Sequence, residues 1–443
     1  MESVLRAIKK IIPDPLLNAV RKPYHYTLGV LAAVVYGFPG RRLNVIGVTG
    51  TNGKSTTATL IATALEAGGY SVGLATTVSF WVGKKKTLNE TKMTSRGRFQ
   101  TQKLLRKMVA AGNTHAVIEV SSHGIHQHRL WGIPFETAVI TNLTRDHLDY
   151  HGSMEEYRRA KGALFDSLKA SADGQVVSVV NGDDPSAPYF LEFFADHKYV
   201  FGTSPAAAAV MPLAHTVIAK NVKADATGSR FTAQAEDVVI PLQINIPGRF
   251  NVSNALAAAS VALAYRVKPK VIAAAIESVT GIPGRMELVE AGQSFPVVVD
   301  YAHTPDAFEN VLSTLRDLTK GKLISVFGAT GDRDRGKRPE LGKIAATYSD
   351  FMILTEEDPA SEDPLDIIEE VKPGIDRAKR NVPYEVEPNR RTAIRMALER
   401  AKPGDTVVLL GKGHETVMVY ADGKQPWDDR AVAAEEWRKL GRR

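Results

Sequence analysis

The stretch GVTGTNGKSTTATL, from Gly47 to Leu60, lies between a short apolar run and a segment with the composition of a helix. Free backbone N–H groups at a helix N-terminus favour phosphate, a lysine there can reach the β- and γ-phosphates, and a serine hydroxyl can ligate Mg²⁺. The stretch therefore predicts a loop that binds a nucleoside triphosphate. The residues expected at ATP are Gly50, Thr51, Asn52, Gly53, Lys54, Ser55 and Thr56. Val48 departs from the general pattern, which has glycine six residues before the lysine.

Around this loop, apolar runs rich in β-branched residues alternate with helix-like stretches from Leu43 onward. This alternation is typical of an α/β fold with a mostly parallel sheet, and it puts functional residues just past the carboxyl ends of the strands. A more β-like patch, residues 215–248, predicts a small antiparallel annex. After the turn-like GIPGR (Gly281 to Arg285), a second series predicts a Rossmann-like α/β domain. We expect a short helical segment (1–40), a central ATP-binding domain (41–282) and a C-terminal domain (283–443).

The composition excludes several kinds of functional site. The 443 residues include no cysteine, which excludes disulfides, zinc-thiolate sites and a thiol nucleophile. The net charge of +7 is spread along the chain with no long basic block, so it favours a polyanionic small substrate and no nucleic acid.

The N-terminal region carries an apolar stretch from about Tyr24 to Phe38, which is shorter than the roughly 20 residues of a spanning helix and has no secretory cleavage pattern. Two interpretations stay open. The segment is either a helical pair packed on the next domain or a helix on a membrane surface. In the second case the basic residues at the headgroups would be Lys9, Lys10, Arg21, Lys22, Arg41 and Arg42.

Two further stretches, EVSSHGIHQHRL (119–130) and TNLTRDHLDYHGSMEEYRRAKGALF (141–165), each follow an expected strand. They bring Glu119, His147 and Lys161 to the same end of the sheet as the phosphate loop. Each residue alone is more often an ordinary polar group, but together with a phosphate loop they predict a catalytic site.

Several motifs in this order resemble those of the Mur ligases: GTNGKST, EVSSHG, TNLTRDHLDYHG with AKGALF, GRFNVSNALAA, PGRMELV, DYAHTPDA, GATGDRDRGKRP and GKGHE. The match is closest to the MurE type, the UDP-N-acetylmuramoyl-dipeptide:amino-acid ligases, and runs from about Leu43 to the C-terminus. It does not cover the N-terminal domain that binds uridine diphosphate in those enzymes, which is longer than the roughly 40 residues preceding Leu43.

The resemblance implies an ATP-dependent acid–amino-acid ligase of peptidoglycan biosynthesis, and so of cell-wall growth, cell shape and division. The γ-phosphate would go to a substrate carboxylate, and an amino acid would then attack the acyl phosphate. Two Mg²⁺ ions are implied, one held by Ser55 and Glu119 and the other by His147 and Lys161. Because an ammonium cannot ligate Mg²⁺, the resemblance implies a CO₂-derived carbamate on Lys161. Lys54, Glu119, His147 and Lys161 would be the catalytic residues.

The remaining roles are carried over position by position. Further ATP contacts would come from Asn251, Asn254, Arg285, Asp300, Tyr301 and His303. The alternative for each asparagine is a helix N-cap. The muramoyl-peptide acceptor would contact Thr94, Ser95, Ser121, Gln127 and Arg129, although TSR departs from the family's TTP. The incoming amino acid would contact Arg333, Glu357, Asp358, Pro359, Ala360, Gly411 and Glu415.

One motif bears on the amino acid. MurE enzymes that use diaminopimelate carry DNPR, whose arginine binds the distal carboxylate, whereas this chain has EDPA at 357–360. The change favours L-lysine or a similar diamine such as ornithine. Alternatives are that the stretch is only an acidic loop, or that Arg390 or Arg391 replaces the arginine.

Rival functions are a MurT-like ligase acting on a lipid-linked precursor, a folylpolyglutamate-synthase-like ligase, and a nucleotide-gated scaffold without catalysis. We expect a monomer in the cytoplasm, with a membrane contact at the inner face if the N-terminal helix makes one.

Overall fold

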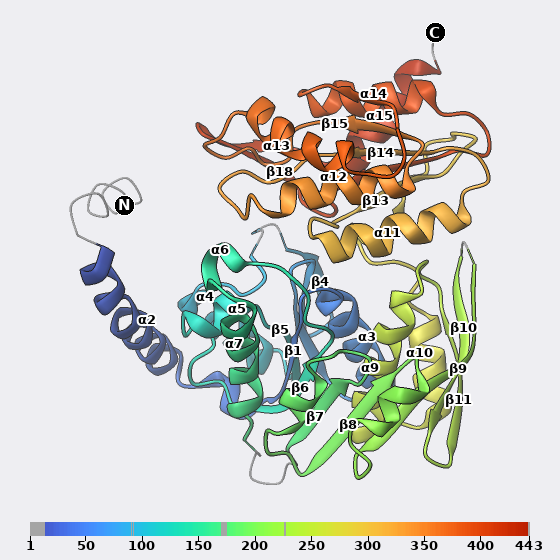
Figure 1. Cartoon of the computed structure of the whole chain (residues 1–443). Helices are drawn as coiled ribbons and strands as arrows, with labels where there is room; N and C mark the ends of the chain where they lie inside the picture. Colours follow the sequence, from blue (N-terminus) through green and yellow to red (C-terminus); the bar gives the residue numbers. More distant parts are fainter. Residues whose placement is uncertain (1–13, 90, 92, 170–174, 226, 442–443) are drawn as a thin grey trace.

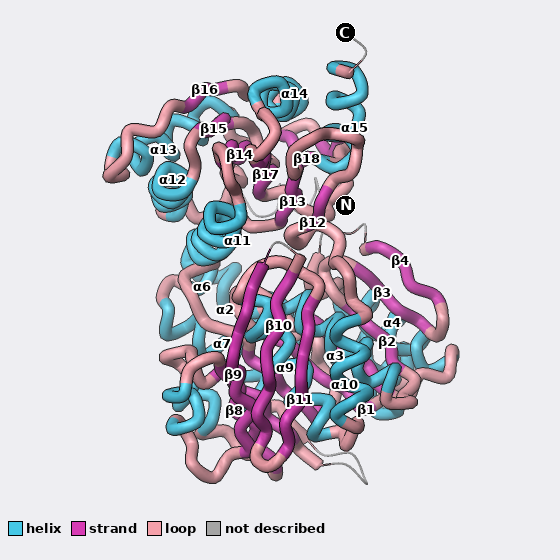
Figure 2. The backbone as a smooth tube through the Cα atoms, turned by 90° about the vertical axis from the view of Figure 1, so that its right-hand side faces the viewer, coloured by secondary structure: helices cyan, strands magenta, loops and turns pink. Residues whose placement is uncertain are grey.

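The structure is a computed structural model that describes residues 14–89, 91, 93–169, 175–225 and 227–441, with side chains from residue 23 onward. Two sheets organise it, and Figures 1 and 2 show the smaller sheet with its helices at one end of the larger. The larger sheet has eleven strands in the order β11-β10-β9-β8-β7-β6-β1-β5-β2-β3-β4. Its strands are β1 (Asn44–Thr49), β2 (Val72–Ala75), β3 (Ser79–Val82), β4 (Lys85–Leu88), β5 (His115–Glu119), β6 (Phe135–Ile140), β7 (Val177–Asn181), β8 (His197–Gly202), β9 (His215–Asp225), β10 (Gly228–Ala235) and β11 (Val238–Ile244).

The centre of this sheet is parallel and covered on both faces. Along β1, Ile46 and Val48 belong to one buried cluster and Val45 to another, as the two-residue period of a strand requires. The first face is covered by α3 (Lys54–Ala67), α9 (Phe250–Ala264) and α10 (Pro269–Glu277). The elements of the other side are α4 (Arg98–Ala110), α5 (Ser122–His126), α6 (Leu148–His151), α7 (Met154–Asp166) and α8 (Ala187–Leu191). A short 3₁₀ turn, η2 (Pro205–Ala209), follows β8.

The β-rich patch is antiparallel, as predicted, and it is continuous with the parallel strands. β9 pairs in parallel with β8, and β10 and β11 then extend the same sheet as antiparallel strands. Figure 2 shows these three strands side by side along one flank. The pairing of β8 with β9 merges the patch into the main sheet.

The smaller sheet has the order β12-β13-β17-β14-β15-β16 and is parallel except for its edge strand β12. Its strands are β12 (Glu287–Leu288), β13 (Val297–Asp300), β14 (Leu323–Phe327), β15 (Phe351–Leu354), β16 (Tyr384–Val386) and β17 (Thr406–Leu410), and a separate hairpin comprises β18 (Val417–Tyr420) and β19 (Gly423–Pro426). Its helices are α11 (Pro305–Leu318), α12 (Lys337–Tyr348), α13 (Pro364–Asp376), α14 (Arg390–Arg400) and α15 (Asp429–Leu440). The predicted α/β fold with a second α/β unit is confirmed, while the boundaries at 40 and 282 stay a prediction.

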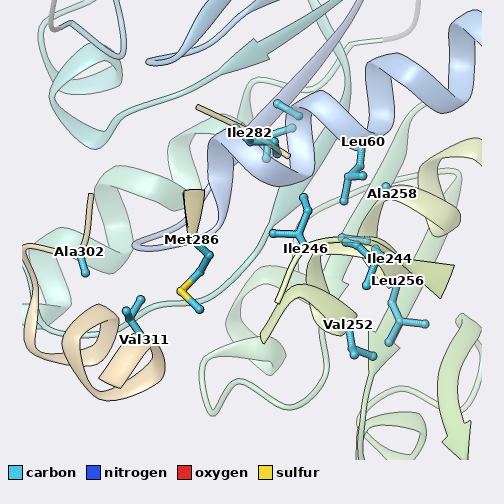
Figure 3. Packing of buried hydrophobic residues seen from close by; sticks show 14 of the residues in the cluster. Leu60, Ile244, Ile246, Val252, Leu256, Ala258, Ile282, Met286, Ala302 and Val311 are labelled. Atoms are coloured by element: carbon cyan, nitrogen blue, oxygen red, sulfur yellow. The ribbon is translucent and has the colours of Figure 1, made fainter. Parts of the chain in front are cut away.

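Apolar packing joins the two units. One buried cluster runs from Leu60 of α3 and Leu256 of α9 through Ile282 and Met286 to Val311 of α11. Figure 3 shows these side chains following one another between the two units. Burying such side chains is worth roughly 1.5 to 3 kcal/mol each, so this bridge helps to fix the second unit against the end of the first sheet.

In the described part of the N-terminal region, the helix α2 (Asp14–Tyr36) is followed by the 3₁₀ turn η1 (Pro39–Arg42). It packs against α4, and Figure 1 shows it at the side of the larger unit. Lys9 and Lys10 lie outside the described residues, as do the side chains of Arg21 and Lys22. Among the described helices, none has the length and apolar character needed to cross a bilayer.

Candidate active site

A cleft of about 840 Å³ lies where the two units meet. It is lined by the phosphate loop, by residues that follow β5 and β6, and by loops of the second unit. A smaller cavity of about 240 Å³ adjoins it, and Asn52, Gly53 and Arg285 line both. The site therefore lies past the carboxyl ends of the parallel strands, as the sequence predicts.

The phosphate loop depends on its two glycines. Gly50 has φ 148° and Gly53 has φ 80°, both in the region that favours glycine. A Cβ on Gly50 would lie 1.9 Å from Thr141 Oγ1, and one on Gly53 would lie 2.3 Å from Asn254 Oδ1. Gly53 also caps α3, where it puts no side chain over the first N–H groups of the helix. These groups are available to an anion.

Lys54, the first residue of α3, is turned back onto the loop, and its Nζ donates to Thr51 O at 2.7 Å. Burial lowers the pKa of this amine, while the nearby carboxylates of Glu119 and Asp146 act in the opposite direction. A triphosphate in the loop would favour its charged form in the same way.

Ser55 and Glu119 meet although they come from different elements. Ser55 Oγ donates to Glu119 Oε2 at 2.7 Å, and the N–H of Thr77 donates to the same oxygen at 2.8 Å. Both side chains are buried. A hydroxyl and a carboxylate oxygen at this separation suit a hard cation such as Mg²⁺.

Lys161 is buried in α7 and its Nζ donates to Gly50 O at 2.7 Å. Burial, reinforced by the charge of Lys54, lowers the pKa of Lys161 well below its usual value. The amine is therefore held close to the phosphate loop in an environment that favours its neutral form.

His147 lies beside Asp146, with 3.2 Å between Nε2 and Oδ2. Burial lowers the pKa of His147 to about 3, so the imidazole is neutral and able to act as a ligand. Burial raises the pKa of Asp146, but His147, His303, Lys337 and Lys54, which are all protonated at the acid pH where this carboxyl titrates, outweigh burial and hold its pKa at about 2.

The proposed metal residues could bind Mg²⁺ only together with oxygen atoms from other sources. Within the described part of the chain, no three His, Asp or Glu side chains come together as a metal site. A metal here would need the Ser55 hydroxyl, the phosphates of the nucleotide and oxygen atoms at the position of Lys161.

The smaller cavity collects the proposed nucleoside residues Asn251, Asn254, Arg285 and Asp300. The idea that the asparagines cap α9 was wrong. Arg249 is the N-cap, Asn251 Nδ2 donates to Pro247 O, and Asn254 Nδ2 donates to Asn251 Oδ1. Tyr301 and His303 line the main cleft.

The proposed acceptor residues all line the main cleft: Thr94, Ser95, Ser121, Gln127 and Arg129. Four of them form one network, in which Arg129 donates to Ser95 O at 2.7 Å and to Gln127 Oε1 at 2.7 and 3.0 Å, whereas Thr94 accepts from Thr77 Oγ1. Ser121 Oγ and Ser95 Oγ are 3.0 Å apart. The bidentate fork of Arg129 thus faces Gln127 here, and an acceptor carboxylate would compete for it.

The proposed amino-acid residues lie on the opposite side of the cleft. All but Pro359 line it: Arg333, Glu357, Asp358, Ala360, Gly411 and Glu415. Lys412 Nζ donates to Asp358 Oδ1 at 2.7 Å and to Glu415 Oε2 at 2.6 Å, so both carboxylates already have a cationic partner. Burial raises the pKa of Glu357 to about 7.

The two arginines considered as substitutes for the missing one do not line the cleft. Arg390 is fully buried against Asp429, at 2.7 Å, and Arg391 pairs with Glu435 and Glu436. Lys424 of β19 does line the cleft. The structure therefore does not support Arg390 or Arg391 in this role.

The sequence analysis did not identify several residues that line the cleft or that contact its lining residues. Asp146 stands next to His147 in the TRDH motif, which was the available signal. Asp306 accepts from Asn52 Nδ2 at 2.5 Å and so ties the second unit to the phosphate loop. Lys337 and Tyr150 come from helices and line the cleft only because of tertiary packing.

Comparison with known proteins identifies the family. The Mur ligase middle domain matches residues 48–262, and the Mur ligase glutamate ligase domain matches residues 284–413. A UDP-N-acetylmuramyl-tripeptide synthetase of Roseiflexus sp. (strain RS-1) is 42% identical over 97% of this chain and 85% of its own length. A UDP-N-acetylmuramoyl-L-alanyl-D-glutamate--2,6-diaminopimelate ligase of Bacillus licheniformis is 41% identical over 92% of this chain and 81% of its own.

Solved structures agree with this. A UDP-N-acetylmuramoyl-L-alanyl-D-glutamate--2,6-diaminopimelate ligase superposes with a TM-score of 0.59 at 33% identity, over 90% of this chain and 79% of the other. The folylpolyglutamate synthase of Mycobacterium tuberculosis shares the fold, with a TM-score of 0.67 at 18% identity over 94% of this chain and 95% of its own. The chain therefore belongs to the Mur ligase family, whose members are ATP-dependent amide-bond ligases that use Mg²⁺.

Proposed function

We propose that this ligase joins L-lysine, or a similar diamine such as L-ornithine, to the free carboxylate of a muramoyl-dipeptide precursor of peptidoglycan, in the cytoplasm. One observation carries the proposal. The cleft brings the phosphate loop, the acceptor network around Arg129 and the loops around Ala360 to the walls of one cavity. An enzyme that only hydrolysed ATP would need water at the phosphate loop and neither of the two other groups.

The reaction follows from the chemistry of a carboxylate. An oxygen of the acceptor carboxylate attacks the γ-phosphorus of ATP, and ADP leaves. The amine of the incoming amino acid then attacks the acyl carbon and loses a proton, and phosphate departs with the oxygen through which it was attached. Held together, the reactants gain the advantage of proximity, and the positive charge around them offsets the repulsion of two anions.

Each wall of the cleft has a role in this scheme. Lys54 and the N-terminus of α3 hold the triphosphate, and Asn251, Asn254, Arg285 and Asp300 border the nucleoside. Mg²⁺ would bind at Ser55 and Glu119, where it would neutralise phosphate charge. Arg129, with Ser95 and Ser121, orients the acceptor, and Arg333 with Glu415 orients the incoming amino acid.

We further propose that Lys161 is carbamylated. The neutral amine adds to CO₂, forming an N–C bond and releasing one proton, and the product is a carbamate with two oxygen atoms. The burial of Lys161 and the lowered pKa of its amine support this, because only a neutral amine reacts with CO₂. The carbamate and neutral His147 would then bind the second Mg²⁺ ion.

The amino-acid assignment rests on Ala360, which lines the cleft where a diaminopimelate enzyme has arginine. Without that arginine, the distal carboxylate of diaminopimelate would lose its bidentate partner. Glu357 and Asp358 lie near Ala360. A side-chain ammonium would favour the charged form of Glu357, whose pKa burial raises to about 7, while Lys412 already pairs with Asp358.

A second candidate acceptor is a lipid-linked muramoyl-peptide, which the apolar surface of α2 favours. Assaying ADP formation with L-lysine and either a soluble UDP-linked dipeptide or its lipid-linked counterpart separates the two. We expect the UDP-linked acceptor to give the higher kcat/KM. A preference of tenfold or more for the lipid-linked acceptor would contradict this choice of carrier. If no ADP formed with either acceptor, the proposed ligation would be contradicted.

A further inference from the structure

Helix α2 presents a continuous apolar stripe to solvent. Tyr24, Leu31, Val34 and Val35 are exposed to 53%, 48%, 56% and 60%, and Thr27 lies between them along the helix. Their spacing of three and four residues puts them on one face. Ala32 and Ala33 lie on the opposite face and are fully buried. The helix is thus amphipathic, with the larger apolar side chains facing outward.

The stripe belongs to a helix that is firmly attached. Arg98 of α4 donates to His25 O at 3.0 Å, and Arg106 of α4 donates to Tyr36 O at 3.1 Å. Gly29 leaves no room for a Cβ, which would lie 2.9 Å from Trp131 Cβ. These contacts run from His25 to Tyr36 of α2 and hold its apolar stripe outward.

Positive charge lies beside the stripe. Lys103, Arg106 and Lys107 of α4 are exposed, as are Arg41 and Arg42 of η1. Neither α4 nor the part of α2 from Pro23 to Tyr36 contains an aspartate or glutamate. An apolar face flanked by bases and free of acids complements a surface that is apolar inside and anionic outside.

We propose that α2 lies in the surface of an anionic lipid bilayer, with Leu31, Val34 and Val35 inserted among the acyl chains and the bases of α4 and η1 at the headgroups. Tyr24 lies at the start of the described stripe and suits the boundary between acyl chains and headgroups. Its ring can contact the acyl chains there, and its hydroxyl can contact the headgroups or water. The helix lies on the bilayer, because no described helix is apolar enough to cross one. This attachment goes beyond the ligase reaction and holds for either acceptor.

The test is co-sedimentation of the full chain with vesicles in the absence of substrates. We expect binding to vesicles of equal parts phosphatidylglycerol and phosphatidylcholine, weaker binding to phosphatidylcholine alone, and weakening with salt. Val34→Glu with Val35→Glu should lower the vesicle partition at least about tenfold, because two charges would enter the apolar layer. Lys103→Gln with Lys107→Gln should reduce the preference for the anionic lipid.

Two matched controls make the same kinds of charge change on other parts of the surface. Leu213→Glu with Val239→Glu alters two residues that are exposed to 96% and 57% outside this face, and Lys220→Gln with Lys223→Gln removes two exposed lysines of β9. Both controls should bind vesicles like the wild type. The proposal is overturned if the wild type does not bind the anionic vesicles or if Val34→Glu with Val35→Glu leaves binding unchanged. It is also overturned if light scattering shows that the variant splits a dimer, because the stripe would then cover a second copy.

Discussion

Replacing Lys161 by alanine is expected to lower ligation at least about a thousandfold, comparable to the loss of a group that stabilises a transition state directly. The reason is that the variant cannot form the carbamate that supplies oxygen ligands beside His147. Adding a short carboxylic acid such as acetate, which can enter the space left by the side chain, should restore part of the turnover. The measurement is kcat for ADP formation with saturating acceptor and amino acid, with and without the acid.

The same variant distinguishes the carbamate from a structural role. Lys161 also donates to Gly50 O. If its role were purely structural, Lys161→Ala would raise the KM for ATP, and added carboxylates would not restore its turnover. Wild-type enzyme freed of CO₂ should lose activity and regain it with bicarbonate, and the alanine variant should not respond. Arg159→Ala, on the exposed side of α7, is the matched control and should keep near wild-type turnover. Near wild-type turnover in Lys161→Ala itself would contradict the assignment.

Introducing arginine at position 360 is expected to move selectivity from L-lysine towards meso-diaminopimelate. A buried carboxylate without its partner costs roughly 2 to 5 kcal/mol, which corresponds to a change of about 30-fold to about 4,000-fold in relative kcat/KM. The wild type should prefer L-lysine or L-ornithine, and Ala360→Arg should shift the ratio by at least about 30-fold. The measurement is kcat/KM for the three amino acids with one acceptor.

Ala360→Gln controls for side-chain volume, because it adds bulk without charge and should lower the rate with every amino acid. Lys424 also lines the cleft and is a cation that could bind the distal carboxylate instead. A wild-type preference of tenfold or more for diaminopimelate would contradict the assignment. If Lys424→Ala then removed that preference, Lys424 would be the residue that binds this carboxylate.

The phosphate loop could be predicted because its requirements are local. Gly50 and Gly53 adopt conformations that favour glycine, and they precede Lys54 at a fixed spacing. The alternation of strands and helices likewise predicted the α/β fold, since each element carries its own period. The sequence did not show which strands become neighbours, so the antiparallel annex of β9 to β11 was predicted without its pairing to the main sheet.

In the candidate site, too, the local motifs could be predicted from the sequence and the contacts between distant residues could not. Glu119 and Lys161 were found through the motifs around them, but the sequence did not reveal that Lys161 would contact Gly50 or that Lys412 would bind the carboxylate of Asp358. Asn251 and Asn254 could be caps or site residues on propensity alone, and only the start of α9 at Phe250 excludes the caps. Lys337 and Asp306 reach the site by packing between two units.

The most direct test of the central claim is the fate of an oxygen isotope. The acceptor is labelled with ¹⁸O in its free carboxylate and incubated with ATP, Mg²⁺ and L-lysine, and the released phosphate is analysed by mass spectrometry. If the carboxylate is activated as an acyl phosphate, each phosphate carries one ¹⁸O atom, and ADP forms only when the acceptor is present. Phosphate free of ¹⁸O, or ADP release that needs no acceptor, would contradict the proposed ligation.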